Sequence, residues 1–507
     1  MRLAMAGVAL AVVAASMIGV NVFLEDAENE RDINLSDSGT FNHSYTMAMD
    51  GWIGYSILCS NTFKSRLRDN QIRWSCENDD ADLEDRFKRL KNGDIDFAVT
   101  TVDAYLSLGQ DYDFPGVVIA VIDQSKGGDA IVAWSDEVKT VNDLANANGK
   151  MAYIADTPSE HFLRAIRSHF ALDKKGQTHT KGTSEEVLAA IKNKDVHSAV
   201  LWEPYVTKAL AVDGIEKVIS TAEVQGVIVD ILLVNKSVLQ HDFEQVKTVL
   251  DQYFQTVDIG RVSPNTLIND VVKTTGIEKS EVSKMMSGVE FSDFNDNAIH
   301  WFPMHTINGN PYTRDSLYDV INRTTDLLGT SGVTVSLPDN NPYRLIASKA
   351  LGEILTDRKA AGTFIEPEPE PIVFEKLSDA EWDQLKVVGK LKTPNVQFSN
   401  GRSELSLTAK QTLDAAVEDL KHYPSYRLLI KGHTSTSGDA EANLELSSNR
   451  AKFVERYFTL AHGIHKNRVK AVGVGGNEPL AREPGETFRA FKYRLPRVEL
   501  ILLRDGF

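Results

Sequence analysis

Apolar and polar positions alternate along most of this chain in a way that predicts short strands followed by amphipathic helices. Apolar residues recur at helical spacing over residues 83–90, and the compact apolar run Asp94–Val99 follows them. The same two signals return as a strand pattern at Met151–Ala155 and a helix pattern at Ser159–His169. Short continuous apolar runs favour buried strands, whereas apolar residues three and four positions apart favour helices.

Further segments extend this alternation. Ile72–Cys76 and Val196–Leu201 predict strands, and Ser184–Ile191 predicts a helix with Ser184 or Thr183 as its N-cap. Repeated strand–helix order is typical of an α/β fold with a largely parallel sheet.

The N-terminus carries the longest apolar stretch of the chain. Leu3–Leu24 is almost continuously apolar, with Arg2 before it and an acidic segment, residues 25–30, after it. As a helix it is long enough for a hydrocarbon core of roughly 30 Å, and the charges favour an N-inside orientation. We expect an uncleaved inner-membrane anchor. A cleaved signal peptide is the alternative, since small residues surround Ala14–Ser16.

A second boundary lies at Glu366–Pro371, where Glu and Pro alternate. Such a segment stays extended and packs no core, so we expect a semi-rigid spacer. The predicted organisation is an anchor at 1–24, an acidic tether at 25–42, a large domain at 43–355, a linker at 356–371 and a smaller domain at 372–507.

The length, net charge and motifs of the chain exclude several classes of function. A chain of 507 residues is too long for one core, and a net charge of −16 argues against nucleic acid as a partner. We find no nucleophile elbow, phosphate loop or zinc-helix motif and therefore expect neither an enzyme nor a metal or cofactor site. The two cysteines, Cys59 and Cys76, are either a disulfide in an exported protein or two buried thiols.

The C-terminal part resembles the OmpA-like domain. The residues that carry the resemblance are the turn Gly432–Thr434, the pair Leu446–Ser447, the pair Arg450–Ala451 and the segment Arg497–Glu499. The resemblance implies an α+β domain that binds peptidoglycan, in which an Asp and an Arg hold the zwitterionic diaminopimelate.

Arg450 matches the family arginine, but Ser435 stands where the family has the aspartate. A hydroxyl can bond an ammonium but cannot neutralise it, and a charge-assisted bond is roughly twice as strong. Asp439 is a candidate substitute; the alternative is a retained fold with weakened binding. The peptidoglycan-binding residues implied by the resemblance are Thr434, Ser435, Asn443, Leu446, Arg450 and Arg497.

The large domain resembles periplasmic solute-binding proteins of the nitrate, sulfonate and thiamine-precursor group. The resemblance rests on the order of several short motifs, which are Gly51–Gly54, Asn92–Phe97, Asp123–Ile131, Asp156–Glu160, Leu201–Pro204 and Met286–Val289. It implies a two-lobed, type II-like fold whose lobes are joined by two strands and close on a small ligand, expected here to be anionic or heterocyclic.

Strand ends are where ligands of open α/β sheets bind. The predicted ligand-binding residues are Trp52, Gly54, Thr101, Asp103, Ser125, Asp129, Thr157, Ser159, Glu160, Trp202, Glu203 and Asp230. Three structural alternatives remain open: Trp52 as a core residue, Asp123 and Asp129 as residues that fix a crossover strand, and Trp202–Pro204 as hinge packing.

Together these features predict a single-pass inner-membrane protein with its bulk in the periplasm. It would bind a small solute by lobe closure and contact peptidoglycan or an envelope protein through its last domain. The alternative is a structural or interaction protein of the envelope whose cleft no longer binds a ligand. A processing enzyme related to the thiamine-precursor group is a weaker third possibility, because the His and Cys motifs of that group are not found here.

Overall fold

The computed structural model describes residues 41–145, 150–170, 172, 177–304, 316–365, 374–392, 396, 398, 405–423 and 426–504. The predicted anchor, nearly all of the predicted tether and the Glu/Pro segment lie outside these residues. Within them, no helix combines the length and apolarity needed to cross a bilayer.

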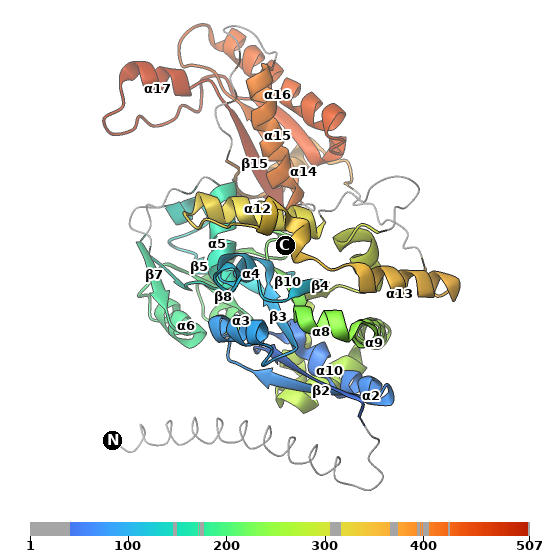
Figure 1. The fold of residues 1–507 in the computed structure, drawn as a ribbon. Coiled ribbons are helices and arrows are strands. Elements are labelled where there is room, and N and C mark those ends of the chain that lie inside the picture. Colours follow the sequence, from blue (N-terminus) through green and yellow to red (C-terminus); the bar gives the residue numbers. More distant parts are fainter. Residues whose placement is uncertain are drawn as a thin grey trace, which may run out of the picture.

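The first lobe is built on a six-stranded mixed sheet (Figure 1). In spatial order its strands are β11 (Val289–Phe291), β4 (Val117–Ser125), β10 (Val229–Val234), β3 (Phe97–Thr101), β1 (His43–Met49) and β2 (Ile72–Asn78). The helices of this lobe are η1 (Ile53–Cys59), α2 (Asn61–Asp69), α3 (Leu83–Asn92), α4 (Val102–Ser107), η2 (Gly109–Tyr112), α8 (Lys236–His241), α9 (Phe243–Val262), α10 (Pro264–Thr275), α11 (Lys279–Ser287), the π-helical η4 (Asp296–Trp301) and α13 (Lys349–Ala360).

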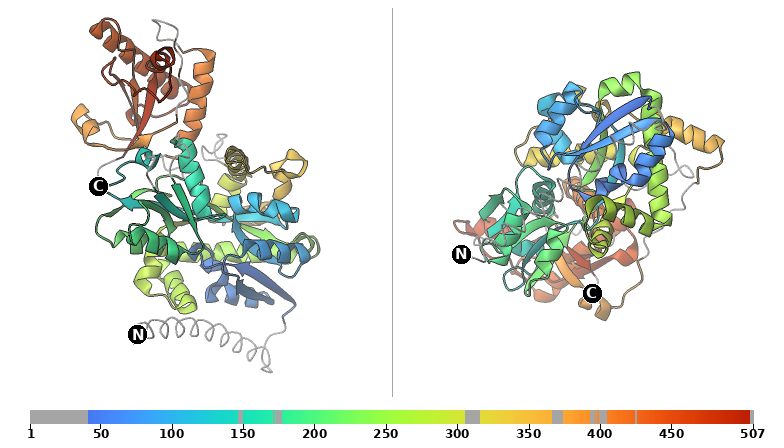
Figure 2. Two further views of the ribbon diagram at one scale, coloured as in Figure 1. Left: turned by 90° about the vertical axis from the view of Figure 1, so that its left-hand side faces the viewer. Right: turned by 90° about the horizontal axis from the view of Figure 1, so that it is seen from below.

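The second lobe is built on a five-stranded sheet. Its order is β7 (Gln177–Lys181), β6 (Lys150–Ile154), β8 (Ser198–Trp202), β5 (Asp129–Trp134) and β9 (Ile215–Ser220), with η3 (Val141–Ala145), α5 (Pro158–His169), α6 (Ser184–Lys192) and α7 (Tyr205–Leu210). In Figure 2 the teal and green second lobe lies beside the blue first lobe.

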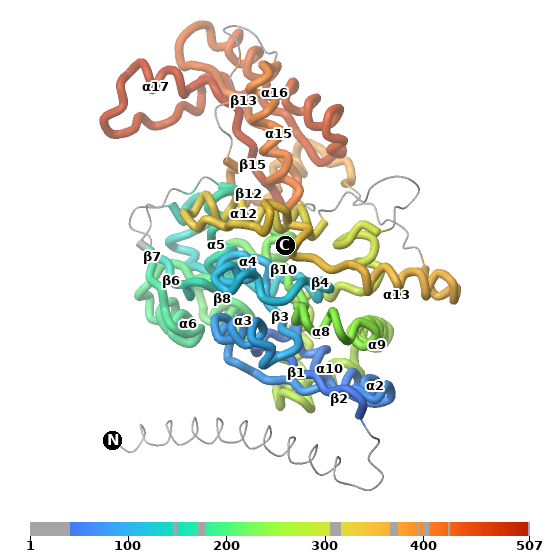
Figure 3. The backbone as a smooth tube through the Cα atoms, viewed as in Figure 1, coloured from blue at the N-terminus to red at the C-terminus, as the bar shows by residue number. Residues whose placement is uncertain are grey.

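The chain crosses between the lobes twice, at residues 126–128 and 221–228 (Figure 3). This arrangement agrees with the two-strand hinge that the resemblance implied. The sheets are mixed rather than largely parallel, which corrects our expectation. Strands that enter a lobe through a crossover run antiparallel to their neighbours: β10 pairs so with β3 and β4, and β5 with β8 and β9.

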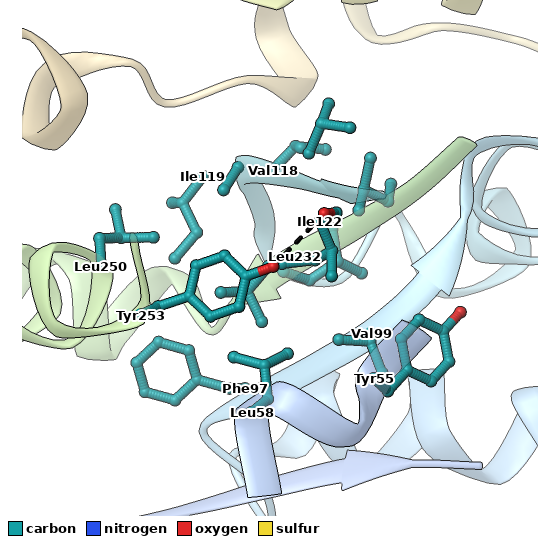
Figure 4. Packing of buried hydrophobic residues seen from close by; sticks show 14 of the residues in the cluster. Tyr55, Leu58, Phe97, Val99, Val118, Ile119, Ile122, Leu232, Leu250 and Tyr253 are labelled. Atoms are coloured by element: carbon teal, nitrogen blue, oxygen red, sulfur yellow. Dashed lines mark hydrogen bonds between the residues drawn. The ribbon is translucent and has the colours of Figure 1, made fainter. Parts of the chain in front are cut away.

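The core of the first lobe lies between its central strands and the helices η1 and α9 (Figure 4). Leu58 and Leu250, from these two helices, pack with Phe97 and Leu232 of the sheet, and all four are fully buried. Tyr253 of α9 donates a hydrogen bond to the carbonyl of Ile122 (3.3 Å), so the buried phenol has a partner.

Helix α12 (Leu317–Thr330) spans both lobes. It contacts α4 of the first lobe and α5 of the second, and α4 and α5 also touch each other. These three helices therefore hold the two lobes in contact. The predicted domain boundary at residue 355 falls inside α13, which packs on α9.

The C-terminal domain has a four-stranded sheet in the order β12 (Lys386–Lys390), β15 (Val498–Arg504), β13 (Arg427–Gly432) and β14 (Val469–Gly473). Its helices are α14 (Asp379–Gln384), α15 (Leu407–Lys421), α16 (Ala440–Ala461), η7 (Lys466–Arg468) and α17 (Phe488–Arg494). Because α16 packs on β13 and β14, it lies beside the turn that follows β13.

This domain packs on the second lobe, above it in Figure 1. His169 at the end of α5 bonds the hydroxyl of Tyr423 (2.8 Å), and the rings of His169 and His422 stack. His422 and Gln225 form two hydrogen bonds, of 2.9 and 2.7 Å. Gln225 belongs to the second crossover, so the C-terminal domain contacts the hinge itself.

Cys59 and Cys76 form a disulfide, which settles the alternative left by the sequence. It joins η1 to β2 and closes a loop with a sequence separation of 17 residues. The disulfide thus fixes η1, the helix that follows Trp52, to the edge of the sheet.

Replacing both cysteines by serine should lower the unfolding free energy by about 3 kcal/mol, the entropy expected for a loop of this length. Urea denaturation of the oxidised protein and of the double variant measures the difference. Equal midpoints for the two proteins would show that this loop does not need its cross-link.

Candidate functional site

Three polar residues form a row across the sheet of the first lobe, where it meets the second. Asp230 of β10 is in register with Thr101 of β3 on one side and Asp123 of β4 on the other. Side chains of residues paired across strands point to the same face. Asp123 and Asp230 are essentially unexposed, and their carboxyls are near enough to share a proton.

The segment after β1 supplies the partners of these acids. The indole Nε1 of Trp52 donates to Asp123 Oδ1 (3.3 Å), and the hydroxyl of Tyr55 donates to Asp230 Oδ1. Gly54 lies between them without room for a side chain: a Cβ there would sit 2.2 Å from Asp123 Oδ2 and 2.5 Å from Trp52 Nε1. The Gly-Trp-Ile-Gly motif thus lets the backbone approach the two aspartates.

The site continues along the first crossover into the second lobe. Ser125 donates to Asp129 Oδ2 (2.6 Å) and lies 2.8 Å from the hydroxyl of Thr221 in the second crossover. Asp129 is in register with Trp202 of β8. The tip of the Trp52 ring lies against Gly128, so this ring reaches from Asp123 to the hinge.

Several buried polar atoms at this junction have no hydrogen-bond partner among the described residues. They include Asp103 Oδ1 on the first lobe and Ser159 Oγ and His161 Nδ1 on the second. The three side chains are at most 5% exposed. Buried polar groups normally have partners, so these atoms mark a place where a ligand would supply them.

Burial controls the acidity of the junction. It raises the pKa of Asp129 to about 7; the bond from Ser125 opposes the shift, and Asp103 and Glu203 add to it. Burial likewise raises the pKa of Asp123 to about 7, and that of Asp230 well above its ordinary value. For His161 burial lowers the pKa, because a desolvated imidazolium is costly.

The other predicted residues of the second lobe lie at the junction's edge and bond locally. Thr157 donates to the carbonyl of Ile154 (2.8 Å), and its side chain does not cap α5. Glu160 accepts from the backbone of Asp156 (2.9 Å) and pairs with Arg164. The carboxylate of Glu203 accepts from Thr207, as a local cap of α7.

Sequence reasoning missed Tyr55 and His161 as parts of this site. Tyr55 directly follows the Gly51–Gly54 motif, and this position could have indicated it. His161 carries no such signal in the sequence. It faces the junction only because α5 packs against α4.

The C-terminal site is assembled from the turn after β13, the loop after β14 and helix α16. Thr434 N donates to Gly475 O, and Gly475 N donates to Ser447 Oγ, both at 2.9 Å. Arg450 is buried with its guanidinium carbon 4.9 Å from the centre of the Phe398 ring. The predicted residues Leu446 and Arg450 therefore lie on the helix that packs behind this turn.

Side chains at the rim of this site bond within the domain. Ser435 donates to the carbonyl of Ser437 (3.2 Å), and so does Asn443 (3.0 Å). Asp439 caps α16 by accepting from Ala442 N (2.8 Å), so its position is fixed by the helix end. Arg497 pairs with Glu499 (2.8 Å).

Comparison with known proteins identifies the C-terminal domain: residues 397–492 match the OmpA family. The peptidoglycan-binding protein ArfA of Mycobacterium tuberculosis is 32% identical over 107 residues, 21% of this chain and 32% of that protein. The peptidoglycan-associated lipoprotein of Pseudomonas aeruginosa is 34% identical over 84 residues, 17% of this chain and 49% of that protein. The chain thus spans half or less of these relatives.

Solved structures similar to the chain cover its N-terminal part. The periplasmic aliphatic sulphonate binding protein SsuA from Escherichia coli matches with a TM-score of 0.47 and 16% identity, covering 60% of this chain and 97% of that one. A putative periplasmic sulfonate-binding protein SsuA from Methylobacillus flagellatus KT has a TM-score of 0.49 and 14% identity, covering 66% and 100%. The desulfurization enzyme DszB has a TM-score of 0.43 and 12% identity, covering 62% and 100%.

Gly54→Ala should disrupt the junction, because its Cβ would collide with Asp123 Oδ2 and Trp52 Nε1. We expect a loss of about 1–3 kcal/mol in unfolding free energy, as for other overpacked sites. The control is Gly51→Ala, whose Cβ would meet nothing within 4 Å and should change stability by less than about 0.5 kcal/mol. Chemical denaturation measures both; equal effects would contradict the close approach.

The raised pKa of Asp129 predicts how stability depends on pH. Between about pH 4, its ordinary range, and pH 7 the folded state binds more protons than the unfolded state. The unfolding free energy should therefore fall as pH rises through this window, by about 1.4 kcal/mol per pH unit for each such group, and level off above it. Asp129→Asn should remove the contribution of this one group from denaturation curves measured at pH 5 and 8, whereas Asp123 and Asp230 keep the rest of the slope. The exposed control, Asp111→Asn, should leave the pH dependence unchanged, and a wild-type slope in Asp129→Asn would refute the assignment.

Proposed function

We propose that this chain is a solute-binding protein of the cell envelope whose two lobes close on a small molecule, and whose OmpA domain contacts peptidoglycan. The observation that carries the proposal is the set of buried, partnerless polar atoms from both lobes at one junction. A ligand that completes their hydrogen bonds stabilises only the closed state, and this difference in affinity would drive closure.

The proposal is for a binding protein rather than an enzyme. The junction contains acids, hydroxyls and aromatic rings. Covalent catalysis uses a hydrogen bond between a nucleophile and a base. His161 is the histidine at this junction, and its Nδ1 has no hydrogen-bond partner among the described residues. Among the described residues no group of three or more His, Cys, Asp or Glu could hold a metal ion.

Anchoring in the inner membrane through residues 1–24, with the bulk of the chain in the periplasm, is part of the proposal. Support comes from the apolar run Leu3–Leu24 and from the Cys59–Cys76 disulfide, which suits an exported protein. A protein tethered at the membrane and at the cell wall cannot carry solute by diffusion. Localised capture or sensing therefore fits the architecture better than free delivery.

An interaction protein whose cleft no longer binds a ligand is the second candidate. Ser435 in place of the family aspartate favours it, as does the packing of the C-terminal domain onto the second lobe. The two candidates differ in one measurable property, since only the first requires a small-molecule ligand.

A thermal-shift screen of the full chain in detergent, against organic cations, sulfonates and pyrimidines, tests solute binding. A ligand at 100 times its Kd should stabilise the folded state by about 2.7 kcal/mol. The shift should disappear in Trp52→Ala, because Trp52 contacts both Asp123 and the first crossover. If no compound shifts the wild-type protein, the interaction-protein candidate is favoured.

Sedimentation with insoluble peptidoglycan tests the second contact. Ser435→Asp should increase the bound fraction several-fold, because a carboxylate neutralises an ammonium that a hydroxyl only bonds. Arg450→Lys should decrease it, since lysine cannot form the two-pronged contact of arginine with a carboxylate. The control is Arg456→Lys, an exposed arginine on the same helix. No effect of any variant would separate this domain from peptidoglycan.

A further inference from the structure

The junction between the lobes carries an excess of negative groups. Asp103, Asp123, Asp129 and Asp230 are all at most 5% exposed, and they come from four different elements of both lobes. Their hydrogen bonds within the described residues come from Trp52, Ser125 and Tyr55, all uncharged donors. Buried carboxylates are normally paired with a cation, and here none of the four has one.

Three basic residues around this region are paired with other acids. Arg86 is fully buried, bonded to Asp79 (2.6 Å) and Asp50 (3.2 Å). On the second lobe Arg164 pairs with Glu160 (2.8 Å). Beside the first crossover, Lys126 pairs with Glu290 (3.0 Å).

A second observation, independent of charge, points to a ligand here. Asp103 Oδ1 is buried and lacks any hydrogen-bond partner, although it opens helix α4 at the contact with α5. Ser159 and His161 of the second lobe present partnerless buried atoms in the same region. These atoms come from both lobes, so a ligand that reached them would hold the lobes together.

The rest of the lining is aromatic. Trp52 lies between Asp123 and Gly128, and Trp202 is in register with Asp129. A tryptophan face attracts a cation, and most strongly when the pair is desolvated. Aromatic rings together with carboxylates are thus complementary to an organic ammonium group.

We propose that the solute of this cleft is a small organic cation, whose ammonium or amidinium group is held by Asp103, Asp129 and the Asp123–Asp230 pair. This inference rests on the proposed solute-binding function. Of the anionic or heterocyclic ligands expected from the sequence resemblance, it replaces the anionic ones. An anion would add to the negative charge of a buried site whose aspartates have no lysine or arginine partner among the described residues. Ser159 and His161 would bond a polar, uncharged part of the same molecule.

The proposal also accounts for how closure depends on the ligand. Asp123, Asp129 and Asp230 are buried in the structure, which is costly unless they bind protons or a cation. A cationic solute supplies the missing charge and permits these three carboxyls to ionise. Binding near neutral pH should therefore release protons to the solvent.

Isothermal titration calorimetry of the full chain in detergent tests the inference with charge-matched probes. Choline is compared with its uncharged carbon isostere dimethylbutanol, putrescine with butanediol, and benzylammonium with benzyl alcohol; ethanesulfonate represents anions. We expect at least one cation to bind at least tenfold more tightly than its uncharged partner. Titration in two buffers of different ionisation enthalpy should show proton release at pH 7.

Asp103→Asn is the test variant, because it removes a charge while keeping the shape of the side chain. It should weaken cation binding at least tenfold without lowering the midpoint of thermal unfolding of the unliganded protein. Asp129→Asn provides a second variant from the other lobe. Asp111→Asn, exposed on η2, is the matched control and should bind as the wild type does.

The outcomes separate the inference from the function on which it rests. Binding of ethanesulfonate or of the uncharged partners in preference to the cations would overturn the inference and leave solute binding intact. Binding of a cation that Asp103→Asn and Asp129→Asn both leave unchanged would also overturn it. If none of the probes binds, nor any compound of the wider thermal-shift screen, the solute-binding function falls as well.

Discussion

Four aspartates are buried where the two lobes meet, and among the described residues no lysine or arginine pairs with them. The stability of this arrangement depends on how their negative charge is neutralised. Asp123 and Asp230 can share a proton, while Asp129 holds a hydroxyl bond from Ser125. The shared proton neutralises one carboxylate of that pair, and the bond from Ser125 neutralises none, so further protons or a cationic ligand must complete the site. The hinge, the aromatic side chains and the contact between α4 and α5 all lie around these aspartates.

The second crossover links this constraint to the C-terminal domain. Thr221, at its start, bonds Ser125 beside the acids, and Gln225, four residues later, bonds His422 of the OmpA domain. Hinge residues absorb the backbone changes of lobe closure. Since one short segment contacts both the ligand junction and the OmpA domain, the position of that domain and the state of the lobes are physically connected.

Local signals in the sequence predicted local structure well. Pro158 begins α5 and Thr183 caps α6, because the geometry of a helix start depends on adjacent residues alone. The close approach of the Gly54 backbone to Asp123 was not predicted from the Gly-Trp-Ile-Gly motif. In the C-terminal domain the Gly432–Thr434 turn lies beside α16, in keeping with the OmpA resemblance.

It was harder to predict which residues form the site, because this depends on the order of the strands in the sheet. Asp123 and Asp230 are far apart in sequence and become neighbours only because β10 inserts between β3 and β4. The antiparallel entry of β10 and β5 after each crossover is not visible in apolar periodicity. An anionic ligand was expected because the absence of a counter-charge appears only when every partner of the buried acids is known.

The most direct test is the distance between the lobes, measured by pulsed electron spin resonance. Spin labels would replace the exposed Lys88 of α3 and Lys192 of α6, one on each lobe, with the native disulfide kept. The account predicts a broad distance distribution at pH 8 without ligand that narrows to one population when the binding cation is added. A single, unchanged distance under both conditions would show that the lobes do not close on a solute.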